Sequence, residues 1–139
     1  MRWSLVPRSC VQATPRPLAR EGVIRGDRVA FIGASGPEFA EVLYGAAKCG
    51  AIFTAVNHRL ARAEVLAILA DAEPAIVIVD PAAAPLVADS SCDTLIADLD
   101  YLAWRDARQL HDPGEPVGPD ETALILYTSG TTGTRRALS

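Results

Sequence analysis

The sequence predicts an α/β fold, a mostly parallel sheet flanked by helices, on three observations. Short apolar runs alternate along the chain with longer amphipathic segments. Glycine and proline separate most of these segments, as they do where strands and helices end. Half of the 139 residues are hydrophobic, which suffices for one domain with a buried core. Strands that alternate with helices favour right-handed crossovers and therefore parallel strand pairs.

The chain is predicted to begin with an irregular segment. Residues 1–17 contain three prolines and show neither helical nor strand periodicity. Leu18–Glu21 resembles the last turn of a helix that Gly22 ends, and Gly26-Asp27 predicts a turn into the first strand. We therefore assign residues 18–139 to the folded unit.

Five segments are predicted to be strands because they are short, apolar and bounded by residues that break regular structure. They are Val29–Ile32, Ala51–Val56, Ala75–Val79, Thr94–Leu99 and Thr122–Tyr127. The third is continuously apolar, which is typical of a strand covered on both faces. The Asp80-Pro81 pair is predicted to end it.

Amphipathic helices are predicted between these strands because apolar residues recur there at helical spacing. In the first helix, Ser35 is predicted to cap the N-terminus, Pro37 to open the first turn and Gly50 to end the helix. The second helix is predicted over Ala61–Glu73, before Pro74.

The last part of the chain combines a short helix with a linker. The helix is predicted over Tyr101–Leu110. The segment His111–Glu121 is rich in proline and glycine and is predicted to be an exposed linker. The final apolar strand then leads directly into a loop of glycines and hydroxyl side chains.

This loop has the composition of a phosphate-binding loop. It consists of Thr128, Ser129, Gly130, Thr131, Thr132, Gly133 and Thr134. Glycines let backbone N–H groups converge on an anion, and each hydroxyl donates a further hydrogen bond. The alternative is a flexible linker of the same composition. A linker would not normally follow a buried strand, which is where open α/β sheets place their ligand loops.

The run Tyr127–Thr134 resembles the nucleotide-binding signature of the adenylate-forming superfamily, which includes acyl-CoA synthetases, luciferases and peptide-synthetase adenylation domains. Upstream motifs resemble the same superfamily in order and spacing. They are Gly22-Val23, Gly26-Asp27-Arg28-Val29, Pro37-Glu38-Phe39, Gly50-Ala51 and Asn57-His58-Arg59-Leu60. The resemblance covers Leu18 to Thr134 and implies that residues 18–139 are a truncated part of the large N-terminal domain.

The resemblance also implies a reaction. In that superfamily the loop holds the β- and γ-phosphates of ATP while a carboxylate attacks the α-phosphate, and a thiol later captures the acyl-adenylate. The chain is thus expected to be a fragment of an AMP-forming acid–thiol ligase for a fatty or related carboxylic acid, with ATP, Mg²⁺ and CoA implied. The family's adenine, ribose and catalytic-lysine contacts lie downstream, so no catalytic residue is assigned and the chain alone is expected to be inactive. The alternative is a non-catalytic remnant or a small nucleotide- or protein-binding module.

The chain departs from the family pattern after Thr134. Where the family continues with Pro-Lys-Gly, this chain has Arg135-Arg136-Ala137. Arg136 stands at the lysine position, and its guanidinium can pair with phosphate, although a solvated surface charge is an equal alternative. Pro-Lys-Gly could be written CCG-AAG-GGC, and the loss of one base from the first codon would give CGA-AGG-GC, which encodes Arg-Arg-Ala. A single-base frameshift after Thr134 is therefore one hypothesis for the shortened chain.

Other site patterns are weaker. Gly33 and Gly36 lack the third glycine and the later acidic residue of a dinucleotide site, so we interpret them as a structural turn. Gly133-Thr134 does not supply the lysine of a P-loop. His58 and His111 have no second ligand nearby in sequence, so they are interpreted as surface histidines and no metal site is predicted.

Composition restricts the partners that are expected. The formal net charge is −4 and the arginines are scattered, which disfavours nucleic acid and anionic membranes as partners. Cys10, Cys49 and Cys92 lie too far apart in sequence for a disulfide framework or a zinc motif. The N-terminus lacks the apolar run of an export signal, and no segment is long enough to cross a bilayer. A cytoplasmic protein with small-molecule partners is expected.

Overall fold

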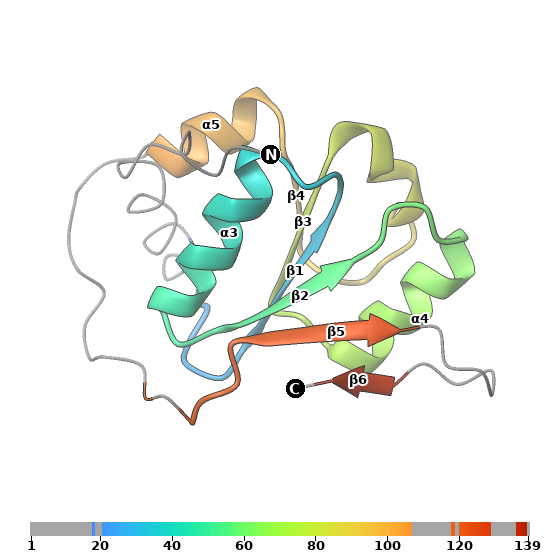
Figure 1. The fold of residues 1–139 in the computed structure, drawn as a ribbon. Helices are drawn as coiled ribbons and strands as arrows, with labels where there is room; N and C mark the ends of the chain where they lie inside the picture. The colour runs from blue at the N-terminus through green and yellow to red at the C-terminus, as the bar shows by residue number, and fades with distance from the viewer. Residues whose placement is uncertain (1–17, 19–20, 107–117, 119, 129–135, 139) are drawn as a thin grey trace.

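Six strands form a single sheet in the order β4-β3-β1-β2-β5-β6 in a computed structural model of the chain (Figure 1). The structure describes residues 18, 21–106, 118, 120–128 and 136–138. The strands are β1 (Arg28–Ile32), β2 (Ile52–Val56), β3 (Ile76–Val79), β4 (Thr94–Ile96), β5 (Leu124–Thr128) and β6 (Arg136–Leu138). The helices are α3 (Pro37–Lys48), α4 (Arg62–Ala72), the 3-10 helix η2 (Pro81–Leu86) and α5 (Leu99–Asp106). The predicted irregular segment 1–17 lies outside the described residues.

The sheet is parallel except at one edge. β1 pairs in parallel with β2 and with β3, which places Val29 beside Phe53 and Ile76. β3 pairs in parallel with β4, and β2 with β5. Among the strands of the described residues, only β6 runs antiparallel, against β5. The predicted α/β class with a mostly parallel sheet is confirmed, but the sequence analysis missed β6.

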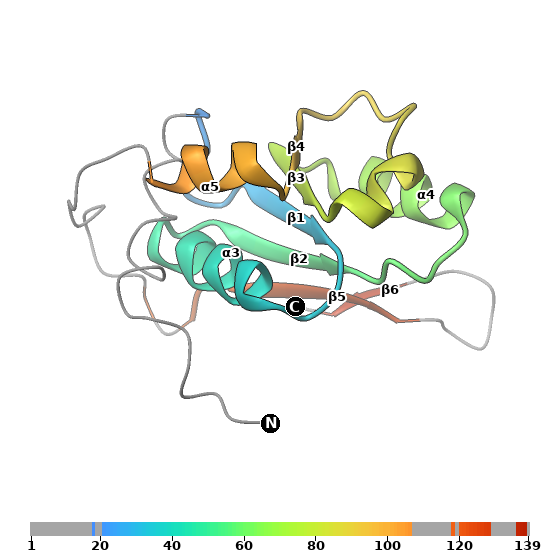
Figure 2. The same ribbon diagram turned by 90° about the horizontal axis from the view of Figure 1, so that it is seen from above.

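Helices cover both faces of the sheet and form two cores (Figures 1 and 2). α3 and α5 pack on one face, where Phe31, Phe53 and Tyr101 are buried. α4 and η2 pack on the other face, where Ile32 and Val79 are buried. Neighbouring residues of a strand point to opposite faces, so a strand in the middle of the sheet buries side chains on both faces and is mostly apolar. All four residues of β3 are buried, as the continuous apolar run predicted.

The ends of α3 show one error in the prediction. Gly36, not Ser35, is the N-cap residue, because the Gly36 carbonyl accepts the first helical bond, from Ala40. Pro37 occupies the first turn as predicted. At the other end Gly50 has φ +68°, a conformation that costs glycine little. Its N–H donates to Ala47 and the next N–H donates to Ala46, which completes a Schellman motif.

At both ends of α4, side chains form hydrogen bonds with backbone groups of the helix ends. The Ala61 N–H donates to Glu64 Oε2 over 2.9 Å, which satisfies one donor at the N-terminus. At the C-terminus, Arg28 donates from Nε to the Ala72 carbonyl over 2.7 Å and from Nη2 to the Glu73 carbonyl over 2.9 Å. A guanidinium at this end also complements the helix dipole. The predicted helix over Ala61–Glu73 is confirmed with one residue less at each end.

The region after β3 differs in detail from the prediction. The predicted strand Thr94–Leu99 ends at Ile96, because the chain turns where the Asp98 N–H donates to the Ile96 carbonyl. Leu99 instead begins α5, whose described part ends at Asp106. Of the predicted linker, only residues 118, 120 and 121 are described. No helix in the described part of the chain is long and apolar enough to cross a membrane.

Candidate functional site

The parallel strands β1, β2, β3 and β5 end at the same edge of the sheet, which we call the carboxyl edge. Gly33 follows β1, Asn57 follows β2 and Asp80 follows β3. Thr128 is the last residue of β5 and the first residue of the predicted phosphate-binding loop. Ligands of open α/β sheets bind at this edge, so Thr128, the first residue of the predicted loop, lies where such ligands bind.

Three of the connections at the carboxyl edge contact one another. The Asp80 carboxylate accepts a hydrogen bond of 2.7 Å from the Ala34 N–H. A Cβ atom at position 33 would lie 2.3 Å from the Asp80 carboxyl carbon, so any residue larger than glycine there would displace the Asp80 carboxylate. His58 Nδ1 lies 3.0 Å from the Gly33 carbonyl and must donate to it, since a carbonyl only accepts. This geometry supports the interpretation of Gly33 as a structural turn.

The same contacts correct the interpretation of His58. Its side chain is partly buried and joins the connection after β2 to the one after β1, so it is not simply a surface histidine. His111 lies outside the described residues. From the sequence, Asp80 was expected only to end a strand. Its contact with Ala34 spans 46 residues and leaves no local pattern in the sequence.

The predicted phosphate-binding residues are only partly described. The backbones of Thr128 and Arg136 lie opposite each other in the antiparallel register of β5 and β6. Residues Ser129, Gly130, Thr131, Thr132, Gly133 and Thr134 lie outside the described residues. The predicted phosphate contacts of Thr128–Thr134 and Arg136 therefore stay predictions. In this register, the residues on either side of positions 129–135, Thr128 and Arg136, are paired between the last two strands of the sheet.

Tyr127, the residue before Thr128, is held by a contact to α4. Its hydroxyl donates to Asp71 Oδ2 over 2.6 Å. Burial, followed by the hydrogen bond to Asp71 and the charge of Asp71, raises the pKa of the Tyr127 phenol to about 12. The phenol is consequently protonated near neutral pH, and the Asp71 carboxylate is the acceptor.

The Cys49 thiol is partly buried. Burial raises the pKa of the Cys49 thiol to about 11, which suppresses the thiolate that a nucleophile or metal ligand requires. Within residues 21–106, 120–128 and the other described positions, no group of three or more His, Cys, Asp or Glu side chains gathers as metal ligands would.

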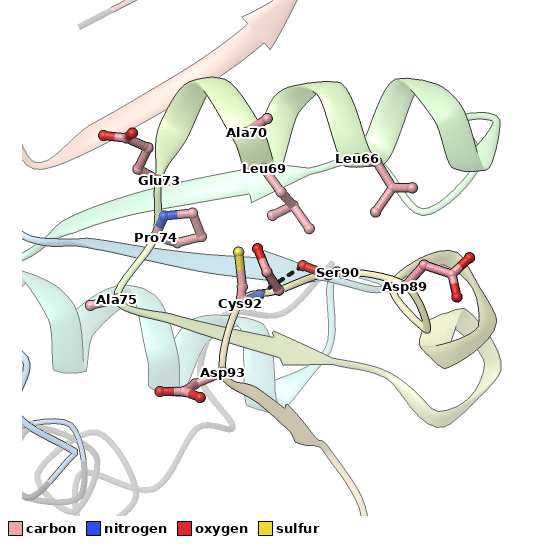
Figure 3. Close-up of a pocket in the computed structure, with 11 residues that line it drawn as sticks. Leu66, Leu69, Ala70, Glu73, Pro74, Ala75, Asp89, Ser90, Cys92 and Asp93 are labelled. Carbon is pink, nitrogen blue, oxygen red and sulfur yellow. Dashed lines mark hydrogen bonds between the residues drawn. The ribbon is translucent and has the colours of Figure 1, made fainter.

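A cavity of about 580 Å³ lies between α4 and the segment that leads into β4 (Figure 3). Leu66, Leu69 and Pro74 form an apolar side, and Ser90 and Cys92 lie across from them. β4 and β5 lie toward opposite ends of the strand order. None of the residues that line the cavity belongs to β5 or β6.

Comparison with known proteins identifies related sequences and folds. The profile of the family described as AMP-binding enzyme matches residues 11–137. A long-chain-fatty-acid–CoA ligase of Mycobacterium tuberculosis is 38% identical over 120 residues, which cover 81% of this chain and 24% of that protein. A fatty acid–[acyl-carrier-protein] ligase of Streptomyces coeruleorubidus is 35% identical over 121 residues, 84% of this chain and 23% of that protein.

The solved structures agree with the sequence relatives. A fatty acyl CoA synthetase of Mycobacterium tuberculosis superimposes with a TM-score of 0.84 at 29% identity, over 99% of this chain and 28% of that one. The chain therefore spans about a quarter of the length of the curated relatives named above, 23% and 24%.

Proposed function

This chain belongs to the AMP-binding enzyme family, and we propose that it forms the phosphate-binding part of an ATP-dependent, AMP-forming ligase. The intact ligase would activate a fatty or related carboxylic acid as an acyl-adenylate and then transfer the acyl group to CoA. The named relatives act on fatty acids, which supports this substrate class. We further propose that residues 18–139 are part of the large N-terminal domain of such an enzyme.

The observation that carries the proposal is the position of the β5–β6 pair. β5 ends at the carboxyl edge, and β6 returns antiparallel beside it, so the glycine- and hydroxyl-rich connection begins where ligands of α/β sheets bind. Hydroxyl and backbone N–H donors are the groups that suit a polyphosphate chain. The donor set therefore fits the triphosphate of ATP.

Each residue type in the loop has a proposed task. The hydroxyls of Thr128, Ser129, Thr131, Thr132 and Thr134 and the N–H groups near Gly130 and Gly133 would hold the β- and γ-phosphates. Arg136 would add a charge-assisted contact to the same phosphates. Such contacts position ATP and stabilise the charge that develops during transfer. Mg²⁺ would reach the site bound to the ATP phosphates.

The first test is binding of Mg-ATP to the chain, measured by calorimetry. We expect a Kd on the order of millimolar, because a phosphate loop alone must offset the entropy lost on association. The variant Thr131→Ala/Thr132→Ala should weaken binding further. Thr122→Ala removes an exposed threonine just before β5 and serves as the control. Equal binding by the loop variant and the parent would contradict the proposed phosphate contacts.

The second test is pyrophosphate release from ATP in the presence of carboxylic acids. We expect none from this chain, which spans only about a quarter of the length of its relatives. Release that depends on a carboxylic acid would refute this expectation. Micromolar ATP affinity without any release would instead favour a small nucleotide-binding module.

A further inference from the structure

The hydrogen bond between Tyr127 and Asp71 connects the end of β5 to a helix that lies 56 residues earlier in the chain. Tyr127 is on the face of the sheet that α4 covers, and its ring packs against the core on that face. Because the donor is neutral and the acceptor is a carboxylate, the contact is a charge-assisted hydrogen bond. Asp71 is exposed, so its carboxylate does not need Tyr127 as a hydrogen-bond donor in the way that a buried carboxylate would.

The helix that carries Asp71 is itself fixed in place. Val65, Ile68, Leu69 and Ala72 are buried against the sheet. Immediately after Asp71, the carbonyls of Ala72 and Glu73 accept hydrogen bonds from Arg28, the first residue of β1. Asp71 therefore occupies a part of α4 that is anchored both by packing and by hydrogen bonds.

The strand register links Tyr127 to the proposed phosphate-binding loop. Tyr127 pairs with Ala137, and the next residue, Thr128, pairs with Arg136. Thr128 is thus the point where the strand ladder ends and the loop begins. A side chain that fixes Tyr127 also limits how far the backbone of Thr128 can move.

We propose that Asp71 is a positioning residue that acts through Tyr127 to fix the backbone of Thr128, the first residue of the phosphate-binding loop. The inference rests on the proposed function, because that function assigns phosphate binding to the loop. The hydrogen bond between Tyr127 and Asp71 itself does not depend on a ligand. A loop held in its binding conformation loses less conformational entropy when phosphate binds. The effect should therefore appear in the free protein and again in phosphate affinity.

Three variants of the full 139-residue chain isolate the contact. Asp71→Ala removes the acceptor, Tyr127→Phe removes the donor, and Asp71→Asn retains an acceptor oxygen without the charge. The control is Asp93→Ala, which removes an exposed carboxylate beside β4, at the other end of the strand order.

The first measurement is amide hydrogen exchange of the ligand-free chain at Thr128 and Arg136, which lie opposite each other in the register of β5 and β6. Exchange should be about threefold to tenfold faster in Asp71→Ala and Tyr127→Phe, because local opening becomes easier. Asp71→Asn should restore most of the protection, and Asp93→Ala should match the parent. The midpoint of global unfolding should change no more in the Asp71 variants than in Asp93→Ala. Unchanged exchange in both Asp71→Ala and Tyr127→Phe would overturn the proposal.

The second measurement is the affinity for inorganic tripolyphosphate, followed by phosphorus NMR. Asp71→Ala and Tyr127→Phe should each weaken binding about threefold or more, and the double variant should be no weaker than either one, because both remove the same contact. Additive losses would contradict a shared contact. If the parent itself does not bind tripolyphosphate, the proposed function fails for this chain, while the exchange data still decide whether Asp71 positions the strand end.

Discussion

The carboxylate of Glu41 is an almost fully buried charge within α3, with a side-chain exposure of 3%. It accepts a hydrogen bond of 3.0 Å from the Tyr101 hydroxyl and one of 3.2 Å from Arg105 Nη1, both on α5. Buried charges are tolerated when they are paired and hydrogen-bonded. These contacts explain how α5, a short helix, is held in one orientation on α3.

Replacing the Glu41 carboxylate should lower the stability of the folded protein. We expect Glu41→Ala to lower the free energy of unfolding by about 3 kcal/mol, because Arg105 and Tyr101 would each lose a buried partner. Glu38→Ala, on the first turn of the same helix, should cost no more than about 1 kcal/mol. Urea unfolding of both variants checks the difference, and similar losses would show that the contact contributes little.

At the scale of elements, an ion pair joins the segment that precedes β5 to the turn that precedes β1. The Glu121 carboxylate accepts from Arg25 Nε over 2.7 Å and forms a second contact with Arg25 Nη2. It also accepts from the Gly118 N–H over 2.7 Å. The hydrogen bond from Arg25, followed by the one from Gly118, lowers the pKa of Glu121 to about 2.

The ion pair between Arg25 and Glu121 should make part of the free energy of unfolding depend on pH. The folded pKa of Glu121 is about 2 and the ordinary value is 4.5, so the folded state binds this proton more weakly than the unfolded state. The contribution is present above the ordinary pKa and is lost as the pH falls toward the folded value. The carboxylate is exposed, so the effect should be modest.

The measurement compares the stability of the parent with that of Glu121→Gln across acidic pH. The parent should be the more stable of the two near neutral pH, and the difference should shrink between pH values of about 5 and about 2. A difference that stays constant over this range would show that the ion pair does not stabilise the fold.

At the scale of the whole molecule, the sheet is unevenly covered. α3 packs on β1 and β2, at the centre of the sheet, and α4 packs on β2 and η2. On β5 the side chain of Leu126 is 43% exposed, although it lies in a strand. β6 is a short edge strand in the order of the sheet, and edge strands present unpaired backbone groups. Tyr44, Ile96 and Leu102 add further exposed apolar surface.

We expect this surface to bind a hydrophobic dye and to promote association of the isolated chain. Leu126→Thr should reduce dye binding while it retains a residue that favours strands. Ile24→Thr is the matched control, because Ile24 is 68% exposed but lies in a turn. A monodisperse chain that does not bind the dye would show that the described fold is self-sufficient.

The order of strands and helices could be predicted from the sequence because its causes are local. The apolar run of β3, the proline that opens α3 and the glycine that ends it act on neighbouring residues. The loop motif Tyr127–Thr134 is likewise contiguous, so the resemblance to the family could be seen in the sequence. Its phosphate contacts stay a prediction, because residues 129–135 lie outside the described part of the chain.

The tertiary structure alone decided which distant residues meet. β5 pairs with β2, which precedes it by about 70 residues, and only this pairing brings Tyr127 within reach of Asp71. Glu41 and Tyr101, 60 residues apart, meet because α3 and α5 share one face of the sheet. β6 forms because β5 offers an open edge, although its own three residues show no strand period. Periodicity and turn chemistry act over a few residues, whereas these contacts depend on the order of the strands, which no single segment encodes.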